Sequence, residues 1–160
     1  MTKTGSQDRT GGKGSRIARR SAARLMAVQA VYEFLYTGKR SSELVEDYLY
    51  HRSGTNLGDD VEAVQPDGDL FTQIVKGAAE RKSDILNIVG QHVHDNQGEG
   101  LDLLLKAILV CATYEFIACP DTDAPIIISD YVEVTKSFYG GQESRLVNGI
   151  SDSIARTVRF

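Results

Sequence analysis

The amino-acid sequence predicts an all-α fold, a compact helical bundle of about six to seven helices. Along most of the 160 residues, apolar side chains recur at spacings of three and four, which is the period of an amphipathic helix. Glycine, proline and serine residues interrupt this pattern at intervals, and no two segments alternate as paired strands would. A fixed-period repeat is absent as well, so the pattern favours a bundle over a solenoid.

The first part of the chain predicts two helices. One spans Arg16 to Tyr36 and is stopped by Gly38, and a second begins at Ser41 or Ser42, whose hydroxyl can cap it. A polar stretch with three glycines, Ser53–Gly68, is expected to be a long loop that separates these helices from the rest of the fold.

The middle of the chain predicts a long amphipathic helix and then an apolar one. The amphipathic helix opens at Asp67 or Asp69 and keeps its period up to Gly90, and a break follows over residues 92–100. The next helix, from about Leu101 to Cys119, is apolar around most of its circumference. It is therefore expected to be the central helix of the bundle.

The C-terminal segment predicts two more helices. Ile126–Ile128 are interpreted as a buried lead-in to a helix over residues 129–138, because Ser129 supplies a cap and Asp130 an acid in the first turn. After a glycine pair, the last helix carries apolar residues at helical spacing over residues 146–158.

Residues 1–14 are almost free of apolar side chains, so they are expected to form a mobile basic and polar tail before a single domain over residues 15–160. No apolar stretch approaches the roughly 20 residues that a membrane span needs, and no secretory signal follows the basic start. A cytoplasmic location is therefore expected. In that compartment Cys111 and Cys119 should be reduced core thiols and not a disulfide or redox pair.

Positive charge is concentrated at the start of the chain. The first 24 residues carry seven basic side chains and one acidic one, whereas the remaining residues carry 11 basic and 21 acidic ones. Long-range attraction to phosphate is the usual reason for such an asymmetry. The basic end is therefore expected to meet an anionic partner, and nucleic acid is the first candidate.

Four arginines, Arg16, Arg19, Arg20 and Arg24, lie in the first turns of the first predicted helix, where several can share one side. Arginine suits phosphate because its planar guanidinium donates two parallel hydrogen bonds. Cations near a helix N-terminus oppose the helix dipole, so four of them indicate a compensating anionic partner. The alternative is a charged helix start that only adds solubility.

Residues that could support catalysis or hold a metal are few. His92 and His94 have the spacing of two metal ligands, but no third ligand lies nearby in sequence. The aspartate pairs at positions 59/60 and 121/123 lie in predicted loops, where solvation and turn formation explain them better than acid–base catalysis does. Neither a glycine-rich phosphate loop nor a serine nucleophile elbow occurs. We therefore predict no catalytic residue, no metal and no cofactor.

Three stretches together resemble one family, the bacterial transcription antitermination factors of the NusB family. The first, Arg19–Phe34, has an arginine-rich start followed by an Ala-x-Gln-Ala-x-Tyr helix. The second, Lys106–Phe116, contains a Tyr-Glu pair, and the third, Ile128–Arg156, contains Val147-Asn148-Gly149. With the segments between them, the three stretches cover most of the chain from Arg16 onward, and their joint occurrence is specific.

The resemblance implies a compact helical RNA-binding protein with no enzymatic activity. Members of the family pair with NusE, a small-subunit ribosomal protein, and the pair binds the single-stranded boxA element near the start of ribosomal RNA transcripts. With other Nus factors they keep RNA polymerase from terminating. The free protein is expected to be a monomer or a homodimer, because an apolar surface awaiting NusE can bury itself against a second copy.

The resemblance also assigns RNA contacts. The arginine-rich start of the family maps onto this chain's first helix. Leu146 stands where the family commonly places a phenylalanine beside the RNA surface, and Tyr139 is the expected substitute as a base-stacking platform. The RNA-binding residues implied in this way are Arg16, Arg19, Arg20, Arg24, Tyr139 and Leu146.

The partner-facing residues implied by the resemblance are Tyr32 and Glu115, which match a tyrosine and a glutamate that face NusE. Glu115 is therefore expected at the surface, opposite a basic group of the partner.

Structural roles compete with some of these assignments. Tyr32 could pack in a helix interface, Phe138 is expected in the core, and Asn148-Gly149 are expected to form a buried polar cap and a close helix contact. A NusB-like domain also occurs fused to RNA methyltransferases, but 160 residues leave no length for a cofactor-binding α/β domain. The alternative function is a protein-binding helical adaptor whose basic N-terminus contacts RNA nonspecifically.

Overall fold

A computed structural model describes residues 14–52, 64–93 and 101–159 of the chain. Within these ranges the fold is all-α, as the sequence predicts, with seven α-helices, one π-helical turn and no strand. None of the helices described is both long and apolar enough to cross a membrane. The helices are α1 (Arg16–Thr37), α2 (Ser41–Asp47), α3 (Gly68–Glu80), α4 (Lys82–His92), α6 (Leu103–Ala118), α7 (Ala124–Lys136) and α8 (Gly141–Val158), and the π-helical turn is Tyr48–Arg52.

Local sequence explains both ends of α1. The Ser15 hydroxyl accepts a hydrogen bond from the Ala18 amide at 3.0 Å and so caps the first turn. At the other end Gly38 adopts a left-handed backbone with φ 78°, and its amide bonds to the carbonyl of Phe34. By contrast, α2 begins at Ser41 without a side-chain cap, so the expected serine cap is wrong.

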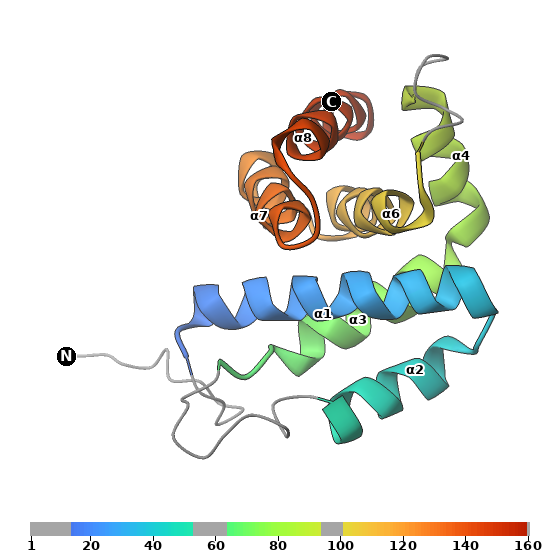
Figure 1. Cartoon of the computed structure of the whole chain (residues 1–160), viewed down its shortest axis with the longest axis vertical. Helices are drawn as coiled ribbons and strands as arrows, with labels where there is room; N and C mark the ends of the chain where they lie inside the picture. Colours follow the sequence, from blue (N-terminus) through green and yellow to red (C-terminus); the bar gives the residue numbers. More distant parts are fainter. Residues whose placement is uncertain (1–13, 53–63, 94–100, 160) are drawn as a thin grey trace.

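The central position predicted for the apolar helix is confirmed. Helix α6 packs against α1, α3, α4, α7 and α8, and its residues from Ala107 to Phe116 are all buried. In Figure 1, α1 crosses the middle of the molecule, with α2 and α3 on one side and α6, α7 and α8 on the other. This arrangement places the start of α1 beside the connection between α6 and α7.

The long helix predicted between Asp67 and Gly90 is instead two helices, α3 and α4. The chain turns at Arg81, whose backbone leaves the helical region at φ −106° and ψ 22°. The N-cap position of α4 is Arg81, whose side chain forms no cap, so this position does not mark the break in the sequence. The helical spacing of apolar residues continues across the turn to Ile85 and Val89, which are also buried. The sequence pattern alone therefore indicates one helix.

The lead-in predicted at Ile126–Ile128 is also wrong, because these residues lie inside α7. The helix begins at Ala124 with Pro125 in its first turn, a position where the missing proline amide costs nothing. Ile127 is fully buried while Ile126 is 54% exposed, as expected for neighbours on a helix and not for a buried extended segment. Three adjacent β-branched residues mask this helix start in the sequence.

Candidate nucleic-acid interface

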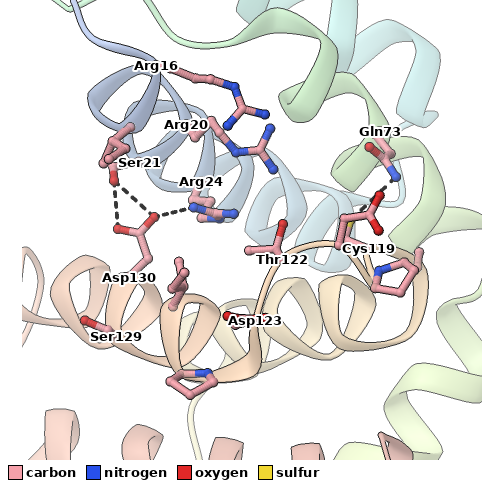
Figure 2. A pocket seen from close by; sticks show the side chains of 16 residues that line it. Arg16, Arg20, Ser21, Arg24, Gln73, Cys119, Thr122, Asp123, Ser129 and Asp130 are labelled. Atoms are coloured by element: carbon pink, nitrogen blue, oxygen red, sulfur yellow. Dashed lines mark hydrogen bonds and ion pairs between the residues drawn. The ribbon is translucent and has the colours of Figure 1, made fainter.

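A cleft of about 850 Å³ lies between the first turns of α1 and the connection from α6 to α7. Figure 2 shows arginines projecting from α1 toward that connection, where Thr122 and Asp123 lie. Two helices therefore meet here with the chain's basic segment on one wall. The charged side chains lining the cleft are Arg16, Arg20, Arg24, Asp121, Asp123 and Asp130.

Arg16 and Arg20 are the two arginines of the cleft that no close hydrogen bond or ion pair holds within the described residues. Arg16 is exposed, and no hydrogen bond or ion pair holds it within the described part of the chain. The Arg20 side chain is 20% exposed, and its guanidinium lies 3.8 Å from a carboxylate oxygen of Asp67, a long ion pair. A pair at this distance is loosely held although it is only partly exposed, so both guanidinium groups can bind an anion.

Arg19 does not line the cleft. Its side chain is buried, and its guanidinium donates hydrogen bonds to the carbonyl oxygens of Gln65 at 2.8 Å and Pro66 at 3.2 Å. The Arg19 carbonyl in turn accepts a bond from the Asp67 amide at 3.0 Å. Arg19 therefore fastens the segment before α3 to α1, which gives it a structural function that the arginine-rich pattern does not reveal.

Arg24 lines the cleft but is only 3% exposed, because two carboxylates hold it. Its guanidinium donates to both carboxylate oxygens of Glu115, at 2.8 and 2.9 Å, and to Asp130 at 2.6 Å. Burial alone would lower the pKa of Arg24, but the hydrogen bond and charge of Glu115 keep it raised above its usual value. The expectation that Arg24 presents its guanidinium to phosphate is therefore corrected, since its donors already bind these carboxylates.

Glu115 is fully buried, so the expected surface position is wrong. Besides Arg24, its carboxylate accepts a hydrogen bond of 2.6 Å from the Tyr131 hydroxyl. Burial and the negative charge of Glu115 raise the pKa of Tyr131 well above its ordinary value, which keeps this hydroxyl protonated as a donor. The glutamate is the centre of a buried polar cluster that joins α1, α6 and α7.

Ser21 and Asp130 complete this cluster at the edge of the cleft. The Ser21 hydroxyl donates to the carboxylate of Asp130, with distances of 2.9 and 3.1 Å to its two oxygens. Figure 2 shows the same carboxylate held between Ser21 and Arg24. Neither Ser21 nor Asp130 stands out as a site residue in the sequence, because the two residues lie on helices far apart along the chain.

Tyr139 and Leu146 lie outside the cleft. The Tyr139 hydroxyl donates to the carboxylate of Asp102, 2.8 Å from both oxygens, and Asp102 also caps α6 through the Leu105 amide. Partial burial and the hydrogen bond to Asp102 raise the pKa of Tyr139. Leu146 is half-buried and packs against the core. Tyr139 therefore ties the turn between α7 and α8 to the start of α6.

Tyr32 lies in the second half of α1 and is 37% exposed, so it is not buried in a helix interface. Its ring stacks on that of Tyr36, with centroids 6.1 Å apart and planes 6° from parallel. Phe138, expected in the core, is 41% exposed. Asn148 and Gly149 are exposed too, so the expected buried cap and close helix contact are wrong there.

Of the two candidate metal ligands, the structure describes His92 alone. His92 forms a hydrogen bond of 2.8 Å with the hydroxyl of Ser153, and His94 and the 59/60 aspartates lie outside the described residues. Within residues 14–52, 64–93 and 101–159, no group of three His, Cys, Asp or Glu side chains could hold a metal ion. Cys111 is buried, whereas Cys119 is half-buried at the cleft.

Comparison with known proteins gives a consistent result. Residues 21–156 match the model of the NusB family. The transcription antitermination protein NusB of Sphingopyxis alaskensis is 38% identical over 88% of this chain and 94% of its own length. The protein of the same name from Sinorhizobium medicae is 35% identical over 89% of each chain.

Solved structures share the fold. T. maritima NusB superposes with a TM-score of 0.69 at 20% identity, covering 86% of this chain and 90% of its own. A crystal structure of NusB and NusE in complex with double-stranded RNA gives 0.71 at 18% identity, covering 88% and 98%. Since the family model spans most of the chain and relatives above 30% identity span nearly all of it, this chain belongs to the NusB family.

Proposed function

We propose that this chain is a transcription antitermination factor that binds the boxA element of nascent ribosomal RNA together with NusE. Its relatives are named transcription antitermination proteins, and a protein of the same fold forms a complex with NusE and RNA. In this proposal the protein acts in the cytoplasm without enzymatic activity. It works with other Nus factors to help RNA polymerase read through terminators.

The observation that carries the proposal is the pair of available arginines at the cleft. Arg16 and Arg20 project from adjacent turns of α1, and neither is held by a close ion pair within the described residues. Guanidinium groups without a close ion pair can exchange bound water for phosphate at little cost in free energy. We therefore assign RNA phosphates to Arg16 and Arg20. Arg19 and Arg24 instead fix α1 to the neighbouring segments of the fold.

Salt dependence of RNA binding tests this assignment. For single strands the slope of log affinity against log salt is about −0.7 per phosphate contact. If Arg16 and Arg20 each contact one phosphate, the double variant Arg16→Ala/Arg20→Ala should lower the magnitude of the slope by about 1.4. A boxA RNA and a scrambled RNA of equal length should both be titrated, because equal affinity for the two would favour the nonspecific adaptor.

The matched control removes two arginines that lie elsewhere. Arg40 and Arg156 are both 78% exposed and line no part of the cleft. The variant Arg40→Ala/Arg156→Ala therefore changes the net charge by the same amount, and its salt slope should stay close to that of the parent. A slope that falls equally in both variants would mean that only net charge matters, and the RNA site would not be this cleft.

The proposed partner contact is Tyr32, by resemblance; the structure adds Tyr36, because its exposed ring stacks on the exposed ring of Tyr32. Tyrosine is enriched in protein interfaces because its ring supplies apolar area and its hydroxyl a hydrogen bond. Tyr32→Ala should weaken NusE binding and leave RNA binding by the free protein unchanged. Tyr50→Ala, at a tyrosine that is 73% exposed in the π-helical turn, is the control.

A further inference from the structure

Arg159, which directly follows α8, binds the backbone at the point where α6 ends. Its guanidinium donates hydrogen bonds to the carbonyl oxygens of Phe116 at 2.9 Å, Cys119 at 2.8 Å and Thr122 at 2.8 Å. A longer bond of 3.4 Å reaches the carbonyl oxygen of Glu115. The last carbonyls of a helix lack partners within the helix, so this guanidinium supplies the missing donors and balances the negative end of the helix dipole.

Arg159 is itself fixed in place. Its amide donates to the carbonyl of Ala155 at 2.9 Å, at the end of α8, and its guanidinium lies 5.9 Å from the centroid of the Phe116 ring. Among the described residues no carboxylate pairs with Arg159, so its donors serve the backbone of α6 and of the connection to α7. The side chain therefore links the end of α8 to the end of α6.

The connection between α6 and α7, residues 119–123, forms one wall of the cleft, and the first turns of α1 form the other. Asp123 stands at the N-cap position of α7 but does not bond to its helix. In the described part of the chain, no side chain other than that of Arg159 forms a hydrogen bond to the backbone of residues 119–123. Arg159 does not line the cleft, so it holds this wall without facing a ligand.

We propose that Arg159 is a positioning residue for RNA, which sets the distance between the α6–α7 connection and the α1 wall that carries Arg16 and Arg20. The inference rests on the proposed RNA-binding function. A strand in a cleft of about 850 Å³ contacts both walls, so its affinity depends on how they are held. Glu115 extends the effect to α1, because its carbonyl binds Arg159 and its carboxylate binds Arg24.

The first experiment measures the affinity and the salt slope of Arg159→Ala for boxA RNA. The affinity should fall about two- to thirtyfold, the range for residues that act on a binding site without touching its ligand. The salt slope should stay at the parent value, because no phosphate contact is lost. A slope smaller in magnitude by about 0.7 would mean that Arg159 itself binds a phosphate, and the inference would be overturned.

Arg156→Ala is the matched control for the loss of one positive charge. Arg156 lies on α8 about one turn before Arg159, is 78% exposed and lines no part of the cleft. Both the affinity and the salt slope of this variant should equal those of the parent. An equal loss of affinity in Arg156→Ala and Arg159→Ala would mean that net charge alone matters, which rejects the positioning role.

Arg159→Lys separates the hydrogen-bond geometry from the charge. Lysine keeps the positive charge, but its compact ammonium cannot reach the carbonyls that the planar guanidinium spans. This variant should therefore lose most of the affinity that Arg159→Ala loses. Full recovery of the parent affinity in Arg159→Lys would show that the charge suffices, and positioning by the guanidinium would be rejected.

Thiol labelling of Cys119 reports the position of this wall in the absence of RNA. Cys119 is half-buried at the cleft, whereas Cys111 is fully buried and should stay unlabelled. Burial raises the pKa of Cys119 and the charge of Arg159 partly opposes this, so the comparison uses Arg159→Lys, which keeps the charge. N-ethylmaleimide should label Cys119 several times faster in this variant than in the parent. An unchanged rate would mean that Arg159 does not hold the wall.

Failure of the inference is separable from failure of the proposed function. If Arg16→Ala/Arg20→Ala leaves the affinity and salt slope for boxA RNA unaltered, the cleft is not the RNA site and both proposals fail. If that double variant binds weakly while Arg159→Ala and Arg159→Lys bind RNA like the parent, the RNA site stands and the positioning role alone is rejected. All titrations are made below the thermal transition of each variant, and Arg159→Lys carries the test if Arg159→Ala does not fold.

Discussion

At the scale of single residues, the buried pair of Arg24 and Glu115 shows that part of the arginine-rich start has a structural role. Two of its four arginines are held inside by hydrogen bonds to protein groups, Arg19 by backbone carbonyls and Arg24 by carboxylates. A buried ion pair is weak evidence for net stability, but loss of one partner leaves an uncompensated charge in a low-dielectric interior. The two residues should therefore be sensitive to substitution one at a time and tolerant of joint replacement.

Glu115→Ala is accordingly expected to lower the free energy of unfolding by about 3–5 kcal/mol, because the Arg24 guanidinium would stay buried without its main partner. Arg24→Met/Glu115→Leu should recover most of that loss. Urea denaturation measures both. Glu133→Ala is the control, since Glu133 is 66% exposed and forms a surface ion pair with Lys136, and it should cost less than about 1 kcal/mol. Equal losses of stability in Glu115→Ala and Glu133→Ala would contradict the buried pair.

At the scale of elements, helix α3 approaches α6 closely at one glycine. A Cβ added to Gly77 would overlap the ring of Tyr114, which is 6% exposed and cannot move away. Gly90 in α4 is the opposite case, because an added Cβ would meet no atom within 4 Å. Glycine-to-alanine substitution should therefore change stability in opposite directions at the two positions. Helix propensity favours alanine at both, but packing opposes it at Gly77.

Gly77→Ala should destabilise the protein by about 1–3 kcal/mol, the usual cost of overpacking, in spite of the gain in helix propensity. Gly90→Ala should stabilise it by about 0.4–1 kcal/mol, because the unfolded chain loses conformational freedom and no contact is strained. Chemical denaturation of both variants against the parent gives the two signs. A stabilising Gly77→Ala would mean that α3 and α6 do not pack at this distance.

Helix ends also carry a pH-dependent contact, from Tyr139 to Asp102. Because the folded state raises the pKa of Tyr139, its contribution to stability is complete below the unfolded value of about 10 and is lost as pH rises beyond it. Tyr139→Phe should therefore flatten the fall in stability above about pH 10. Unfolding at a series of alkaline pH values measures this. Tyr36→Phe, at an exposed ring, should leave the pH profile of the parent unchanged.

At the scale of the whole molecule, charge is divided between a basic start and an acidic body. The chain has a net charge of −4, although seven of its 18 basic residues fall within the first 24 positions. With two available arginines at a cleft whose formal charges cancel, the free protein should bind RNA weakly. A partner that adds basic surface should raise that affinity by sharing the strand between two proteins.

NusE is therefore expected to tighten RNA binding by roughly 1–3 kcal/mol, the usual size of a coupling free energy. Linkage then requires boxA RNA to tighten the pair of this chain with NusE by the same factor. Titrating each pair with the third component saturating gives both values. Two factors near one would exclude a cooperative antitermination assembly.

The sequence by itself determined the helical class of the protein, the position of α1 between Ser15 and Gly38, and the apolar central helix. These follow from local period and capping chemistry, which depend on residues close together in the chain. The family resemblance also rested on sequence alone, because its motifs are contiguous.

Only the tertiary structure decided which charged residues stay available. Arg24 and Arg20 look equivalent in the sequence, but Arg24 meets a glutamate 91 positions away and is buried, whereas Arg20 stays partly exposed at the cleft with only a long ion pair to Asp67. Glu115 likewise looks like a surface charge until its partners come from α1 and α7. The physical reason is that the cost of burying a charge depends on how close an opposite charge lies. Packing between segments far apart in the chain sets the distance between the two charges.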